Sequence, residues 1–221
     1  SLATTEDEPG PRAQWPHWAE LRTSAPGTIG QLTDVLLSAR HPLAARLLAA
    51  DLLSTVPTER TVAGLTSALV ATQFRIRRAA AIALLRISRV APELSPSPRR
   101  LIQLADRELR QPTQRALGDS PIEQSSPFRS DARGDVITPS LEQVFTLLAI
   151  TGDPSALRLA LTAVTSPDPA QRGTGLEYLD NLLPIDVRAR FVALVEQPEH
   201  IPQAAAIEQN AVAELSKQLR D

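Results

Sequence analysis

Apolar residues recur at helical spacing along most of the chain. In the segment SPDPAQRGTGLEYLDNLLP, Leu176, Leu179 and Leu183 fall at i, i+3 and i+7, on one side of a helix. Asp168 and Pro169 predict the start of this helix, because Asp is a favoured N-cap and proline suits the first turn. Similar patterns between short Pro- or Gly-marked breaks predict helices at about 13–23, 28–39, 42–55, 58–70, 74–91, 98–111, 139–151, 154–165, 168–183, 185–197 and 203–219. Strand signals are missing from the sequence.

Three of the predicted helices align without gaps: ARLLAADLL, IRRAAAIAL and QRGTGLEYL. The alignment gives a column of arginines, a column of small residues and a column of leucines: Arg46, Arg77 and Arg172; Ala49, Ala80 and Gly175; Leu53, Leu84 and Leu179. The first two copies are 31 residues apart. A period of about 31 residues, with a pair of helices in each unit, is typical of a helical solenoid.

The third aligned segment, QRGTGLEYL, lies farther along the chain than a whole number of 31-residue steps would place it. Arg172 follows Arg77 by 95 residues, of which two further steps of 31 account for 62 and leave 33. Residues 111–139 are rich in Ser, Pro, Gly and Asp, lack sustained periodicity and match this excess in length. We therefore expect an irregular insertion there. Long loops of this kind are commonly mobile or functional. Residues 1–12 are polar and acidic and predict a flexible linker, which leaves 13–221 as one helical domain.

Two short motifs resemble a known repeat family. The run Ile76, Arg77, Ala80, Ala81, Ala83 and Leu84 resembles the first helix of HEAT and HEAT-like repeats, and Asp168 to Arg172 resembles the Asp and Arg pair of the same family. The resemblance covers about 28–197 and implies an all-α, right-handed α-α superhelix, a solenoid of about five helical hairpins. More narrowly, LEYLDNLLP resembles a helical region attached to bacterial membrane proteins similar to nucleotide transporters.

Composition narrows the class of protein further. Aromatic residues make up 3% of the chain, so the core must be aliphatic, and no stretch reaches about 18 apolar residues, the length that spans a bilayer. Cysteine is absent, which excludes disulfides and cysteine-ligated zinc. Methionine is absent even at position 1, so we expect a piece of a larger protein. A cytoplasmic location, or the cytoplasmic part of a membrane protein, fits these features.

The recurring arginines and Gly175 each have a structural and a functional interpretation. Arg46, Arg77 and Arg172 would bind an acidic side chain or helix-end carbonyls of a neighbouring repeat, or would face a phosphate. We favour the structural interpretation because the arginines recur at the repeat period. Gly175 costs helix stability, so we expect another helix backbone or Tyr178 to lie against it rather than a ligand.

A second group of arginines lies on one face of a single helix. Arg75, Arg78, Arg86 and Arg89 share this face at 100° per residue, and Arg77 lies apart from it. The face would dock a polyanion or an acidic partner. Alternatively it is solvated, with long stems covering apolar surface. We favour the solvated face because the net charge is −2 and few aromatic residues lie nearby.

Motifs for catalysis or metal binding are missing. His17, His41 and His200 lie far apart without ligand spacing, and the sequence has no phosphate-binding loop, so we expect no catalytic residue, metal or cofactor. Trp15 and Trp18 would seal the open apolar end of the solenoid, or serve as an exposed docking anchor.

These features favour a monomeric, non-enzymatic scaffold whose partner is a protein or another domain of the same chain. Nucleic-acid binding, as in HEAT-like DNA glycosylases, is the alternative and would need a basic concave groove. A HEAT-like lyase acting on a pigment or other small molecule is a third hypothesis, which would need a polar pocket.

Overall fold

The part of the chain that can be described is entirely helical. The computed structural model describes residues 26–111, 120–128 and 138–195, and in these ranges it contains ten α-helices, one 3₁₀ turn and no strand. The elements are α2 (Pro26–Leu37), α3 (Leu43–Leu53), α4 (Glu59–Ala68), α5 (Phe74–Val90), η1 (Pro92–Leu94), α6 (Pro98–Leu109), α7 (Pro121–Gln124), α8 (Pro139–Ala149), α9 (Pro154–Val164), α10 (Pro169–Asp180) and α11 (Ile185–Val195). None of the described helices has the length and apolar character needed to cross a membrane.

Proline and capping residues set the helix starts as the sequence predicts. Asp168 accepts a hydrogen bond from the backbone N–H of Ala170, and Pro169 occupies the first turn of α10. Asp153 and Pro154 start α9 in the same way. The predicted helices within the described ranges begin within two residues of the observed ones. The predicted helices 13–23 and 203–219, the linker 1–12, Trp15 and Trp18 lie outside the described residues.

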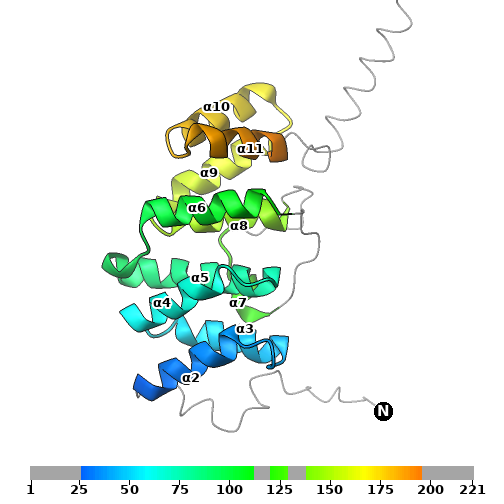
Figure 1. The fold of residues 1–221 in the computed structure, drawn as a ribbon. Coiled ribbons are helices and arrows are strands. Elements are labelled where there is room, and N and C mark those ends of the chain that lie inside the picture. The colour runs from blue at the N-terminus through cyan, green and yellow to red at the C-terminus, as the bar shows by residue number, and fades with distance from the viewer. Residues whose placement is uncertain (1–25, 112–119, 129–137, 196–221) are drawn as a thin grey trace, which may run out of the picture.

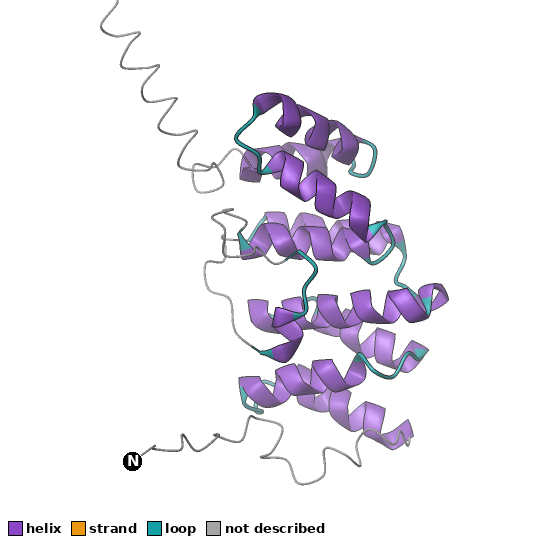
Figure 2. Ribbon diagram, turned by 180° about the vertical axis from the view of Figure 1, so that it is seen from behind, coloured by secondary structure: helices purple, strands orange, loops and turns teal. Residues whose placement is uncertain are grey.

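The helices pack in pairs that follow one another in chain order. Helix α2 packs on α3, α4 on α5, α6 on α8 and α9 on α10. Figure 1 shows these pairs stacked from α2 at one end to α10 and α11 at the other, and Figure 2 shows the same stack from behind. The second helices α3, α5 and α8 also contact one another in that order. Beyond α8 the pattern changes, since α9 packs on α8 and α11 packs on α6.

Helix α8 can be aligned with the three similar segments by its distance from the helix start, although its residues differ from theirs. Arg46, Arg77 and Arg172 each lie three residues after the first residue of their helix, and in α8 this place is taken by Glu142. The step from Arg77 to Glu142 is 65 residues, and the step from Glu142 to Arg172 is 30. The excess of chain therefore lies between α6 and α8. In α8, Phe145 stands where the other copies have a small residue.

The core is mostly aliphatic, with one aromatic contact chain. All eleven residues of α8 are buried. Phe145 of α8 contacts Phe128, with ring centroids 6.0 Å apart, and Phe191 of α11 at 5.9 Å. Such pairs add about 0.5–1.5 kcal/mol each beyond their burial. They join α8 to the segment after α7 and to the last described helix.

The described part of the predicted insertion contains one short helix. Residues 120–128 contain the one-turn helix α7, which starts with a capping box between Ser120 and Glu123. Ile122 and Phe128 are buried, and α7 contacts α3 and α5. The sequence did not predict α7, because tertiary contacts stabilise a turn that is too short to show periodicity. Residues 112–119 and 129–137 lie outside the described ranges.

Gly175 lies where α10 and α9 approach closely, as the sequence predicts. A Cβ added at Gly175 would lie 2.9 Å from the backbone nitrogen of Val164, 2.8 Å from Val164 Cγ1 and 2.9 Å from Ala163 Cβ. The neighbour is the backbone of α9, the first of the two expected alternatives. The close approach offsets the cost of glycine in a helix.

Candidate binding groove beside helix α5

Helix α5 forms ion pairs with three later elements. Arg77 Nε donates to Oε1 of Glu108 on α6 at 2.5 Å. Arg75 binds Glu123 of α7 through two bonds of 2.9 and 2.7 Å. Arg78 forms an ion pair with Glu142 of α8, in which both side chains are almost completely buried.

The four arginines predicted to share a face do not form one exposed basic surface. Arg78 is 1% exposed, and Arg86 donates to Asp51 of α3 and to Ser125, both at 2.6 Å. Arg75 is partly exposed and bound to Glu123, so only Arg89 of the four is exposed. Arg89 forms no ion pair or hydrogen bond with another described residue. The four arginines do share a side of α5, but this side is largely covered, because α5 lies in the middle of the stack, in contact with α3, α4, α7 and α8.

The recurring arginines bind carbonyls near the end of the preceding helix. Arg77 Nη1 donates to the carbonyls of Ala71 and Thr72 at 3.0 and 2.9 Å. Arg172 Nη1 makes the equivalent bonds to Ser166 and Pro167, both 2.8 Å. Through these bonds Arg77 and Arg172 each stabilise the turn within their own helix pair. The sequence had predicted bonds to carbonyls of a neighbouring repeat instead.

Arg46 follows the same rule with different partners. Its Nε donates to the carbonyl of Leu36 in α2 at 2.9 Å, and its Nη1 donates to Oε1 of Gln73 at 2.7 Å. Gln73 is the N-cap of α5, so this bond and the Arg77–Glu108 pair do link successive pairs. The contacts agree with the structural interpretation of the arginine column.

The leucine and alanine columns lie in the core. Leu53, Leu84, Leu179, Ala49 and Ala80 are each at most 1% exposed. Small residues at these crossings let neighbouring helices approach closely. The repeat columns therefore serve packing.

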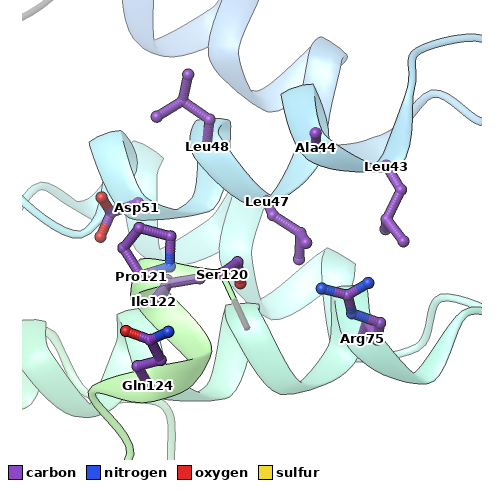
Figure 3. A pocket seen from close by; sticks show the side chains of 10 residues that line it. All are labelled: Leu43, Ala44, Leu47, Leu48, Asp51, Arg75, Ser120, Pro121, Ile122 and Gln124. Atoms are coloured by element: carbon purple, nitrogen blue, oxygen red, sulfur yellow. The ribbon is translucent and has the colours of Figure 1, made fainter. Parts of the chain in front are cut away.

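A groove of about 570 Å³ lies between α3, α5 and α7 (Figure 3). Its lining residues come from these three elements: Leu43, Ala44, Leu47, Leu48, Asp51, Arg75, Ser120, Pro121, Ile122 and Gln124. Figure 3 shows Leu43 and Leu47 pointing from α3 toward the side where Arg75 lies, and Pro121 and Ile122 of α7 on the side where Asp51 lies. The groove is thus mainly aliphatic, with polar side chains at its edges.

The wall formed by α7 is held by Glu123. This carboxylate is buried and accepts bonds from Arg75 and, at 2.5 Å, from Ser120 Oγ. Burial by itself would raise the pKa of Glu123, but the bonds from Arg75 and Ser120 outweigh it, so the pKa lies below its usual value. Glu123 therefore stays ionised at neutral pH and anchors α7 to α5.

Of the arginines proposed from the sequence as binding residues, only Arg75 lines the groove. Arg75 lines it and Arg86 binds the lining residue Asp51, whereas Arg78 and Arg89 are not part of it. The α7 wall was missed. The signal for it is the sequence Ser120-Pro-Ile-Glu123, a capping box with proline in the first turn.

A second, smaller cavity lies at the junction of α5, η1 and the α8–α9 turn. It measures about 320 Å³ and contains Arg89, Ser95 and Thr151. Among the described residues, no group of three or more His, Cys, Asp or Glu side chains is arranged to hold a metal ion.

No family model, no curated protein and no solved structure matches this chain. The function is therefore inferred from the arrangement of its helices and from the groove.

Proposed function

We propose that the chain is a non-enzymatic, HEAT-like helical-repeat scaffold that binds a protein or another domain of its own polypeptide. The observation that supports this is the side-by-side order of the second helices α3, α5 and α8 in a stack of helix pairs. Continued over about five hairpins, such stacking produces a right-handed superhelix with an extended face. Extended faces of this kind provide binding area without a deep pocket.

The face made by α3, α5 and α7 is the best candidate for the contact. It contains the groove, and exposed residues of α7 such as Pro121 and Gln124 lie at its edge. The ion pairs of α5 hold the neighbouring elements in place, which lowers the entropy cost of binding. The resemblance of LEYLDNLLP favours an accessory domain on the cytoplasmic side of a bacterial membrane protein.

The alternative, nucleic-acid binding, has less support. Of the four arginines proposed for it, Arg75, Arg78 and Arg86 each have a carboxylate partner. Affinity for a nucleic-acid backbone comes largely from Arg and Lys side chains that displace the counterions around its phosphates. An arginine that is already paired with a carboxylate contributes less to this affinity.

Site-specific photocrosslinking in cells of the source organism tests the proposal. A photoreactive phenylalanine analogue at Gln124 of α7 should give a covalent adduct with one defined protein, or with another part of the same polypeptide. The same analogue at Ala63, an exposed residue of α4 outside the groove, should not. Equal labelling from both positions, or none from Gln124, would contradict the proposal. Nuclease-sensitive adducts would instead support nucleic-acid binding.

A further inference from the structure

The size of the α3–α7 groove fits a small molecule better than a protein partner. Ten residues line it, and its volume is about 570 Å³. Small-molecule sites measure about 300–1,000 Å³ and are mostly apolar. A stable protein interface, in contrast, uses about 20–30 residues on each side. A protein partner on this face would therefore need contacts well beyond the groove.

We propose that the groove is a binding site for a small uncharged molecule that carries an aliphatic chain. This ligand function is additional to the scaffold function and does not depend on it. Its accessible apolar lining comes from α3 and α7: Leu43 and Leu48 are half-buried, and Ala44 and Pro121 are exposed. An alkyl chain between them would lose its contact with water, which supplies the main binding free energy.

The charges at the edge of the groove favour an uncharged ligand. Arg75 is bound to Glu123, and Asp51 is bound to Arg86, so each charge near the groove has its opposite within the chain. A carboxylate or an ammonium group entering the groove would lose hydration without meeting an excess of opposite charge. A fatty acid or an alkylamine should therefore bind less tightly than the corresponding alcohol.

The groove is formed before a ligand arrives. Ile122 is 1% exposed and Leu47 is 3% exposed, so both walls are packed against the core. Glu123 ties α7 to α5, and Arg46 ties α3 to α2 and to the start of α5. A preformed site avoids the cost of ordering its walls on binding.

Displacement of the neutral fluorescent probe phenylnaphthylamine from the full chain by a series of alkanols is the primary test. The affinity should rise about fourfold for each added methylene from hexanol to decanol, the value for burial of one methylene. Decanoate and decylamine should each bind at least about tenfold more weakly than decanol, because a desolvated charge is costly. Equal affinity for all three head groups, or no dependence on chain length, would overturn the proposal.

A matched pair of variants locates the site. Ala44→Phe places a ring at an exposed position in the groove and should weaken decanol binding at least about tenfold, since it occupies the ligand volume. Ala63→Phe, at an exposed position of α4, should leave binding unchanged. Unchanged binding in Ala44→Phe would overturn the assignment of the site.

Methyl NMR of the unaltered chain gives a readout that needs no variant. Decanol should shift the methyl signals of Leu43, Leu47 and Leu48 and leave Leu159, which is 74% exposed on α9, unchanged. Equal shifts at Leu159 would show surface adsorption and contradict the proposal. Failure of all alkanols, together with a crosslinked protein at Gln124, would show that the face binds protein only.

Discussion

At the scale of single residues, most of the arginines of α5 serve the assembly of the chain. The buried pair of Arg78 and Glu142 joins α5 to α8. Replacing both members of such a pair with apolar residues is often neutral or stabilising, whereas removing one member leaves a buried charge uncompensated. The intact pair therefore adds little net stability, whereas the loss of one member is costly.

Glu142→Gln should lower the free energy of unfolding by about 3–5 kcal/mol, because Arg78 remains charged and buried. The double variant Arg78→Met with Glu142→Leu should recover most of this loss. Urea unfolding followed by circular dichroism measures both. Asp186→Asn in the exposed pair with Arg190 is the control and should cost less than about 1 kcal/mol. A loss below about 1 kcal/mol in Glu142→Gln would contradict this account.

Two glycines of α10 provide a second residue-scale prediction. Gly175→Ala should destabilise the protein by about 1–3 kcal/mol, because the added methyl group would meet the backbone of α9. Gly173→Ala should stabilise it by up to about 1 kcal/mol, since no atom outside the adjoining turns of α10 lies within 4 Å of the new Cβ. Thermal unfolding of the two variants compares them directly. The same sign for both changes would show that α9 and α10 do not approach at Gly175.

At the scale of elements, the sequence predicted helices that carry their own signals and missed those that depend on neighbours. Asp168 and Pro169 mark α10 locally, so its start is predictable. Helix α7 has one turn and is held by Ile122 and by the Arg75–Glu123 pair, which lie far apart in sequence. Helix α8 was predicted as a helix but was not aligned with the three similar segments, because Glu142 stands where they have arginine.

Acidification should weaken the attachment of α7. The pKa of Glu123 is lower in the folded chain than its ordinary value of 4.5, so the unfolded chain binds more protons in this range. The stabilisation by Glu123 is therefore complete above about pH 4.5 and is lost as the pH falls through the folded pKa. The difference in unfolding free energy between the natural chain and Glu123→Gln should shrink over this interval. Urea unfolding at a series of pH values measures it, and a constant difference would count against the anchoring role.

At the scale of the whole molecule, periodicity predicted helix pairs in a row but could not predict which surfaces they leave open. A helical projection correctly puts Arg75, Arg78, Arg86 and Arg89 on neighbouring positions of one helix. The projection gives no information about which elements pack against that face. In the structure, α3, α7 and α8 pack against α5. The groove was unpredictable for the same reason, since it needs α7 in its place beside α3.

The helix pairs pack against one another in a linear order, with α5 and α8 in the interior of the stack. Hydrogen exchange measured by mass spectrometry tests this arrangement most directly, because exchange reports the free energy of local opening. In a linear stack the end helices have neighbours on one side only. We predict the slowest exchange in α5 and α8 and the fastest in α2 and α11. Uniform protection from α2 to α11, or slowest exchange in α2 or α11, would contradict the account.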